Sequence, residues 1–439
     1  MDIEQGIGQP VEQDGSVGIA EPASDDTGLS TSDIKRNMVY IIMLDAIFTT
    51  GAADLMLALQ PLLVFLKASN TMIGLVTGAN WAGLLGVFLS PWITRRFRYK
   101  KWYMFFVHIP YIAAIGVSGL GVLYSKRLGM DNPELLQFML IIFLAHWFFA
   151  GFVSLPHQEY VAACIPMKYR GRYTGFSFSI GGILSIAASA LGGIILLRAE
   201  KPLGFGYVLL LSWAIMQFGY IFALFAKERP TPVEHSPIPW SANMLKAAWN
   251  DKPFMRFLFF NMLIGVLIMP VYQFVAIYGF KTLHMIPATA AVMQVVGQAT
   301  RIIASSPLGW LTDRFTPKRM LPYWMLMAFI SLLPVILLRN QYGVYICGGL
   351  ATVFGVGWIS SFNALMYGLP KPEDRAGHFT LLLITIYITA SAGAILFGVL
   401  SDMMPFRTVF MLCAALALAL FPMARWVANS LSADEKSYS

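Results

Sequence analysis

The residues best suited to chemistry form a polar stripe inside a long apolar run. Gln294, Gln298 and Arg301 recur at spacings of four and three residues, so they would share one face of a helix. A charged group at bilayer depth is costly, which makes it a functional candidate. Because guanidinium binds carboxylate or phosphate through two parallel hydrogen bonds, the stripe predicts a site for an anionic solute. The alternative is an ion pair of Arg301 with Asp45 or Asp54 that only holds the protein together.

Two carboxylates in an earlier apolar run could carry a proton. Asp45 and Asp54 are nine residues apart, which places them about 180° apart around a straight helix, so only one is expected to face a shared cavity. We expect Asp54 to be the coupling residue, with a packing carboxylate as the alternative. His146 is a further candidate for a proton relay because histidine titrates near neutral pH, and packing among its aromatic neighbours is the alternative.

Other polar residues in apolar runs are predicted to line the same cavity. Asn80 lies 218 positions before Gln298, which would make the two amides equivalent if the chain is an internal repeat. Tyr272 and Asn363 are further candidates for the lining.

These residues belong to a chain that is too apolar for a water-soluble enzyme. Of its 439 residues, 57% are hydrophobic and 12% charged, and the mean hydropathy is +0.64, whereas soluble proteins average about 25% charged residues. Cys164, Cys347 and Cys413 show no disulfide or metal-binding spacing. The sequence contains no phosphate-binding loop, nucleophile elbow or dinucleotide fingerprint. We therefore expect no catalysis, no cofactor, no bound metal and no nucleic-acid partner.

Twelve apolar runs of about 20 residues or more indicate an all-α polytopic membrane protein. A polar connection separates six runs from six. The spans are expected at 37–66, 71–94, 101–125, 134–160, 172–198, 205–227, 253–280, 287–312, 319–338, 342–368, 376–402 and 405–429. The corresponding domains are a disordered acidic tail (1–36), a six-helix bundle (37–227), a central loop with an interfacial helix (228–252), a second six-helix bundle (253–429) and a short tail (430–439).

The distribution of basic residues predicts the orientation in the membrane. The loops after the second, fourth, eighth and tenth spans hold 13 Lys or Arg, and the six loops on the opposite side hold eight. Since basic loops are retained in the cytosol, we expect both termini and the central loop to be cytosolic. The expected location is a bacterial inner membrane, with the basic loops in contact with anionic lipid.

A short repeat relates the two halves and points to a family. Residues 92–101 match residues 310–319 at a constant offset of 218, and duplicated six-helix halves are typical of secondary transporters. The segment 309–319, GWLTDRFTPKR, resembles the signature loop of the major facilitator superfamily, Gly-x3-Asp-Arg/Lys-x-Gly-x-Lys/Arg-Lys/Arg. The first-half copy departs from that pattern, because Arg95 stands where the family has Asp.

The resemblance implies a fold of two pseudo-symmetric six-helix bundles and transport by rocker-switch alternating access. By the same resemblance, Gly309, Asp313 and Arg314 would belong to a gate, in which Asp313 latches the cytosolic side. The alternative is that this loop only anchors the topology. A second cytosolic gate is predicted where Glu159 would pair with Arg170 or Arg172, with a purely structural pair as the alternative.

We therefore expect a monomeric, proton-coupled secondary transporter of a small organic solute, for which the Arg301 stripe favours an anion without requiring one. Residues 186–193 faintly resemble an element of the superfamily's drug antiporters, so proton-driven efflux of amphipathic, drug-like compounds is the alternative. Close packing of small residues explains the same segment. A second alternative is a transporter-shaped assembly factor or receptor that moves no solute.

Overall fold

Long apolar segments with polar caps fold into the helices of this protein. In the computed structural model, Ser30 accepts the backbone N–H of Asp33 and so caps the first helix. Asp131 and Glu134 form a reciprocal capping box at a later helix start, which satisfies backbone donors that have no partner within the helix. The structure describes residues 29–230, 246, 248–369 and 375–437, and all regular elements in these ranges are helices. The predicted all-α class is confirmed.

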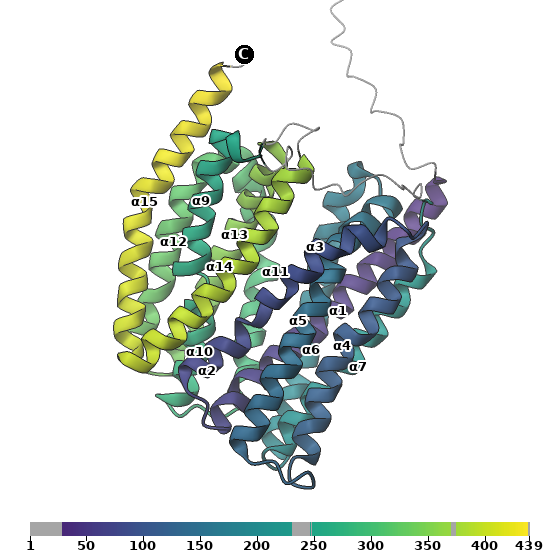
Figure 1. Cartoon of the computed structure of the whole chain (residues 1–439). Coiled ribbons are helices and arrows are strands. Elements are labelled where there is room, and N and C mark those ends of the chain that lie inside the picture. The colour runs from purple at the N-terminus through teal and green to yellow at the C-terminus, as the bar shows by residue number, and fades with distance from the viewer. Residues whose placement is uncertain (1–28, 231–245, 247, 370–374, 438–439) are drawn as a thin grey trace, which may run out of the picture.

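The first half of the chain supplies six membrane crossings, drawn in purple to teal in Figure 1. Its elements are α1 (Thr31–Phe65), α2 (Asn70–Thr77), η1 (Ala79–Ala82), α3 (Gly83–Thr94), α4 (Lys100–Tyr124), α5 (Asn132–Cys164), α6 (Met167–Arg198) and α7 (Leu203–Phe225). One crossing combines α2, η1 and α3.

The second half supplies six more, drawn in green to yellow. Its elements are α9 (Lys252–Leu267), α10 (Val271–Lys281), α11 (Thr289–Phe315), α12 (Pro317–Leu337), α13 (Gln341–Gly368), α14 (Arg375–Met403) and α15 (Phe406–Ser437). One crossing combines α9 and α10, which are interrupted at Pro270, a residue without a backbone N–H. The interfacial helix predicted within 228–252 falls mainly outside the described residues.

Helix α11 is the least apolar of the crossings. Eleven segments of the described chain are long and apolar enough to cross a membrane, and α11 is not among them although it has 27 residues. Its polar side chains include the stripe Gln294, Gln298 and Arg301. Because α11 packs against α6 and α13, protein rather than lipid covers this stripe. The layout is that of twelve helices in two six-helix groups, as expected.

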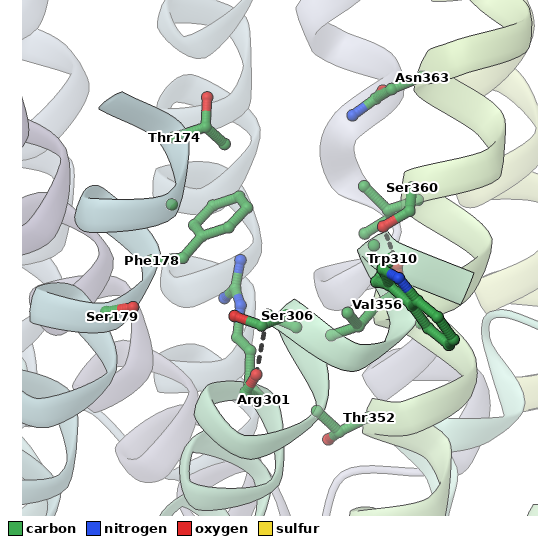
Figure 2. A pocket seen from close by; sticks show the side chains of 15 residues that line it. Thr174, Phe178, Ser179, Arg301, Ser306, Trp310, Thr352, Val356, Ser360 and Asn363 are labelled. Atoms are coloured by element: carbon green, nitrogen blue, oxygen red, sulfur yellow. Dashed lines mark hydrogen bonds between the residues drawn. The ribbon is translucent and has the colours of Figure 1, made fainter. Parts of the chain in front are cut away.

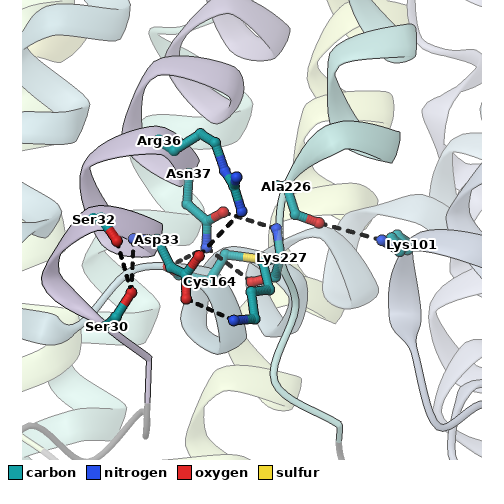
Figure 3. Close-up of polar contacts among 9 residues, drawn as sticks. All are labelled: Ser30, Ser32, Asp33, Arg36, Asn37, Lys101, Cys164, Ala226 and Lys227. Atoms are coloured by element: carbon teal, nitrogen blue, oxygen red, sulfur yellow. Dashed lines mark hydrogen bonds and ion pairs between the residues drawn. The ribbon is translucent and has the colours of Figure 1, made fainter.

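The two ends of the bundle are held together differently. Helix α1 starts, and helix α7 finishes, at the top of Figure 1, and we call this side of the bundle the terminal end. We call the opposite side the far end. At the terminal end, Asn37 is fully buried and its side-chain nitrogen donates to the carbonyls of Cys164 (3.0 Å) and Lys227 (2.8 Å). Its side-chain oxygen accepts the backbone N–H of Lys227 at 2.8 Å. One side chain thus joins α1, α5 and the segment after α7 (Figure 3).

A buried carboxylate completes this end of the first half. Glu228 accepts the backbone N–H groups of Lys100 and Lys101 at 2.5 and 3.0 Å, so it caps the start of α4. Burial raises the pKa of the Glu228 carboxyl, and the two N–H donors oppose that shift. The Lys101 ammonium donates to the carbonyl of Ala226 at 3.2 Å, just beyond the end of α7 (Figure 3), where a cation interacts favourably with the helix dipole.

At the far end, polar contacts join one half to the other. Asp402 on α14 accepts the backbone N–H groups of Asn70 and Thr71, each at 2.8 Å, and therefore caps α2 from the opposite half. The Lys281 ammonium donates to the side chain of Asn70 at 2.7 Å and to the carbonyl of Ala68 at 2.6 Å. We call this group the far-end lock.

Glycines bring the two halves into backbone contact above the lock. A Cβ atom at Gly74 of α2 would lie 2.4 Å from the carbonyl oxygen of Ala394 of α14, and one at Gly398 would lie 2.5 Å from that of Asn70. Side chains at these positions would separate α2 from α14. Close helix packing through small residues is common in membranes, where lipid provides no hydrophobic force between helices.

The Asn37 contacts predict a test of how the first half is stabilised. Asn37→Ala leaves two carbonyls and one N–H without their partner in a buried site, which we expect to cost about 2 to 4 kcal/mol. Arg36→Ala is the matched control, since the Arg36 side chain is 53% exposed and its ion pair among the described residues is with Asp33, a contact that contributes about 0 to 1 kcal/mol. Thermal unfolding in detergent should show a lower midpoint for Asn37→Ala alone. Equal midpoints for the two variants would contradict this account.

Candidate functional site

A cavity of about 800 Å³ lies between the halves. It extends from Arg301 and Thr352, in the middle of their helices, to Trp310 and Asn363, near the terminal end (Figure 2). We call it the central cavity. Its walls are α6 of the first half and α11 and α13 of the second, through Thr174, Gly175, Phe178, Ser179, Arg301, Ser305, Ser306, Gly309, Trp310, Thr352, Gly355, Val356, Ile359, Ser360 and Asn363.

Arg301 is the charged residue of this lining. Its guanidinium carbon lies 4.3 Å from the centre of the Phe178 ring, which belongs to the opposite half (Figure 2). Within the described residues no carboxylate forms an ion pair with Arg301. The alternative that Arg301 pairs with Asp45 or Asp54 does not hold in this structure, because both carboxylates have other partners.

Two smaller cavities continue the central cavity into the first half. One shares Thr174 and Phe178 with it and is also lined by Asp45, Phe48 and His157. The other, of about 220 Å³, shares Asp45, Phe48 and His157 and lies among α1, α4, α5 and α7. Because they share lining residues, the three cavities lie next to one another and form a series. Arg301 lines the central cavity at one end of this series, and Asp45 lines the other two cavities.

Asp45 belongs to a three-residue polar cluster in this series. Its carboxylate lies 3.3 Å from Nε2 of His157 on α5 and accepts a hydrogen bond from the Tyr173 hydroxyl on α6. The side chains of Asp45 and His157 are 24% and 30% exposed, so both are accessible from the cavity. A carboxylate beside an imidazole can hold a proton and pass it on.

Asp54 is placed differently, although we expected it to be the coupling residue. It is fully buried, and one carboxylate oxygen accepts a hydrogen bond from Ser189 of α6 at 3.4 Å. The other oxygen has no hydrogen-bond partner among the described residues, and Asp54 lines none of the three cavities. Of the two acids, Asp45 is therefore the one exposed to the cavity series. A coupling role for either acid stays a prediction.

The remaining predicted binding residues are only partly brought together. Asn363 lines the central cavity, whereas Gln294 and Gln298 lie on α11 outside its lining. The Gln298 carbonyl oxygen is buried without a described partner. Asn80 in η1 accepts a hydrogen bond from Ser391 of α14 at 2.9 Å and so joins the halves.

Tyr272 and His146 lie in the packing between helices. The Tyr272 hydroxyl is 2.8 Å from Oγ of Ser331, within the second half. His146 has Nδ1 2.9 Å from the carbonyl oxygen of Tyr111 and stacks on that residue at 4.5 Å between ring centres. These positions match the packing alternative for His146, and its proton-relay role stays a prediction.

The predicted gate at Glu159 has a different partner from the one expected. Glu159 pairs with Lys100 at 3.8 Å rather than with Arg170 or Arg172. The Arg170 Nε donates instead to the carbonyl of Ile165 at 3.3 Å, beside the start of its own helix, and Arg172 is exposed. The expected pairing was wrong because Lys100, at the start of α4, lies beside Glu159 where α4 packs against α5.

The signature segment lies at the terminal end of α11. Gly309 lines the central cavity, and a Cβ atom there would meet nothing within 4 Å. The exposed Arg314 lies over the ring of Trp310 at 5.1 Å. The side chain of Asp313 lies outside the described residues.

Several cavity residues were missed by sequence reasoning. Phe178 and Tyr387 are aromatic residues in aromatic-rich helices, so nothing in the sequence distinguishes them from lipid-facing neighbours. His157 and Tyr173 carry a clearer signal, since a histidine and a tyrosine stand near the ends of adjacent spans. Within the described residues no group of three or more His, Cys, Asp or Glu could hold a metal ion.

Comparisons with known proteins agree with this architecture. The sequence matches the model of the Major Facilitator Superfamily over residues 39–371 and again over 280–437. No curated protein matches the sequence significantly. The nucleoside transporter NupG is similar in structure, with a TM-score of 0.64 and 14% identity over 89% of this chain and 98% of that one.

Two further solved structures show the same fold. A bacterial homologue of the human lysosomal transporter Spinster, inward-facing and unoccupied, has a TM-score of 0.66 and 13% identity over 92% of this chain and 99% of that one. The Escherichia coli fucose:proton symporter FucP has a TM-score of 0.59 and 13% identity over 89% of this chain and 98% of that one. The family match, the twelve-helix layout and the cavity between the halves lead to one conclusion: the chain belongs to the Major Facilitator Superfamily and is a multi-pass membrane transporter, not an enzyme.

Proposed function

We propose that this transporter moves a small organic anion together with a proton. The observation that carries the proposal is the guanidinium of Arg301, which lines the central cavity without a described carboxylate partner. A buried cation of this kind is costly unless an anion joins it. Guanidinium matches carboxylate and phosphate groups by its planar, two-pronged geometry. The Phe178 ring beside it supplies a cation–π contact.

The second element is the proton site at Asp45. His157 from α5 and Tyr173 from α6 contact its carboxylate, and the adjoining cavity also presents His108, Tyr111, Tyr220 and Tyr387. A proton taken up by the Asp45–His157 pair would offset the charge of an anion bound at Arg301. Such an arrangement suits symport, because substrate and proton then cross together with less net charge in the membrane.

The orientation supplies the direction of access. The basic loops at the terminal end favour the cytosol under the positive-inside rule, so the central cavity would open inward. The far-end lock would then seal the outer side. Rocking of the halves about the central cavity, with the lock released and the terminal end closed, would give alternating access. At the terminal end, Gly309, Asp313 and Arg314 would form the closing latch, with Lys100 and Glu159 nearby in the first half.

The structural relatives support the plausibility of this chemistry on this scaffold. By their titles, one carries nucleosides and another is a fucose:proton symporter. The choice of an anion for the present chain rests on Arg301 alone.

The anion site predicts a binding difference. Arg301→Gln removes the cation but keeps a polar side chain, and we expect at least about tenfold weaker binding of carboxylates, since a hydrogen bond to a charged group contributes about 1.5 to 3 kcal/mol. Thermal-shift titration of the purified protein with carboxylates, phosphates, sugars and lipophilic cations measures this. Arg127→Gln, at an exposed far-end position, is the control and should bind as the parent does. Equal stabilisation of all three proteins by lipophilic cations, and none by anions, would favour efflux instead.

If Asp45 carries the proton, a substitution there should abolish proton coupling and leave binding of the anion intact. In proteoliposomes, Asp45→Asn should abolish anion accumulation driven by a pH gradient, because the proton carrier is gone. Exchange of labelled for unlabelled anion at equal pH needs no net proton movement and should persist. Asp54→Asn is the matched comparison on the same helix. Loss of gradient-driven uptake in Asp54→Asn, with Asp45→Asn unaffected, would assign coupling to Asp54.

The far-end lock predicts a conformational shift. Asp402→Asn weakens the cap that α14 places on α2, so the far-end-open state should gain population, by about tenfold for each 1.4 kcal/mol lost. Spin labels on cysteines introduced at Lys126 and Arg339, exposed positions in opposite halves, would report this as a longer distance. Asp131→Asn is the control because Asp131 caps α5 within one half. An unchanged distance distribution in Asp402→Asn would show that the lock does not hold the closed state.

A further inference from the structure

The smallest of the three cavities has an unusual lining. Its volume is about 220 Å³, and most of its walls are rings from four helices of the first half and from α14 of the second. We call it the aromatic pocket. The rings are Phe48, His108, Tyr111, Trp147, His157, Tyr220 and Tyr387.

Two polar groups in the aromatic pocket lack partners. His108 and Tyr220 are each 2% exposed and stack on one another with ring centres 3.8 Å apart and planes 19° apart. Neither ring nitrogen of His108 nor the hydroxyl of Tyr220 has a hydrogen-bond partner among the described residues. Buried polar groups are nearly always paired, so each exception needs an explanation. A ligand that brings hydrogen-bond donors and acceptors into the pocket would supply the missing partners.

The charges around the aromatic pocket favour a neutral group over a cation. Asp45 is the carboxylate of its lining, and this group already interacts with His157 and accepts from Tyr173. The other titratable groups that face the pocket are His108, Tyr111, Tyr220 and Tyr387, from α4, α7 and α14. Aromatic cages for organic cations depend on the faces of such rings. Here Tyr220 already covers one face of His108, so this pair offers its polar edges rather than a ring face to a cation, and other rings of the lining remain for stacking on a neutral ring.

The size and position of the aromatic pocket identify what enters it. At about 220 Å³ it is smaller than the 300 to 1,000 Å³ typical of sites for drug-sized ligands, so it suits one ring system. The neighbouring cavity joins it to the central cavity through Asp45, Phe48 and His157 on one side and Phe178 on the other. A solute that occupied this series of cavities would place its ring in the aromatic pocket and its anionic group toward Arg301.

We propose that the aromatic pocket binds a planar heteroaromatic ring of the transported anion, through stacking and through hydrogen bonds to His108 and Tyr220. This proposal rests on the proposed function and narrows its substrate class to heteroaromatic organic acids. Tyr387 gives the pocket a link to transport, because it comes from the second half and its hydroxyl lies 2.8 Å from Oγ of Ser154 in the first. When the halves rock, Tyr387 moves with α14, so release of the ring accompanies opening.

The test compares two acids of similar size in the purified full-length protein. Indole-3-acetate carries a planar ring with an N–H donor, and cyclohexylacetate carries the same charge on a puckered ring without one. Isothermal titration calorimetry should show that the parent binds indole-3-acetate at least about tenfold more tightly, as expected of a site built to hydrogen-bond its ligand. Tetramethylammonium serves as the organic cation probe, because it is small enough to enter the pocket.

Three variants assign the preference to the aromatic pocket. Ala150→Phe fills the pocket, since Ala150 lines it, and should remove the preference for the indole while cyclohexylacetate binds as before. Tyr220→Phe deletes one hydroxyl and preserves the ring, which guards against misfolding, and should weaken indole-3-acetate by about three- to tenfold. Tyr103→Phe is the control, because Tyr103 is a buried tyrosine on the same helix as His108, bonded to the carbonyl of Phe152 and outside the pocket lining. It should leave the preference unchanged.

The outcomes separate this proposal from the function on which it rests. If both acids bind equally and both require Arg301, the proposed function stands and the ring assignment is overturned. A preference for indole that survives in both Ala150→Phe and Tyr220→Phe overturns it as well. If Ala150→Phe abolishes binding of tetramethylammonium, the pocket is a cation site and the ring assignment is overturned. If neither acid binds the parent at all, the anion site itself is wrong.

Discussion

The cost of holding a cation at membrane depth governs the architecture around Arg301. A guanidinium there must be shielded from lipid and offered a polar or aromatic neighbour. Helix α11 meets this requirement by lying between α6 and α13, with Phe178 of the opposite half against the charge. That arrangement needs two halves that approach each other closely at α6 and α11. The cavity between the halves is therefore a consequence of where the charge is placed.

In alternating access, the two halves separate at one end of the bundle while they stay in contact at the other end. Contacts within one half and contacts between the halves are found at different ends of the bundle. At the terminal end, Asn37 and Glu228 bind α1, α4, α5 and the segment after α7 within one half. At the far end, Asp402 binds α2 from the other half. A six-helix half that is tied internally can move as one body, and a few polar bonds between halves can be exchanged at low cost.

Sequence reasoning recovered what depends on local pattern. Apolar run lengths gave the twelve crossings, and the i, i+4, i+7 spacing of Gln294, Gln298 and Arg301 identified the helix that lines the cavity. It favoured Asp54 over Asp45, whereas Asp45 is the acid that lines the cavities; the pattern was a poor guide because both faces of α1 are covered by other helices, α6 and α7 among them. Contacts such as that of Asp402 with Asn70, 332 residues apart, depend on tertiary packing. Proximity in sequence also misled the pairing of Glu159, which meets Lys100 instead of Arg170.

The separation of Arg301 from Asp45 has an energetic consequence for the transport cycle. An empty carrier must return with its cavity closed, and Arg301 would then carry an uncompensated charge through an occluded state. Stacking of its guanidinium on Phe178 lowers this cost only in part, because a ring quadrupole contributes about 0.5 to 2 kcal/mol. Asp45 does not relieve it, since its carboxylate is engaged by His157 and Tyr173. Under the proposed function, the occluded state would therefore be more accessible with an anion bound than without one, and this difference would make movement of the halves depend on substrate.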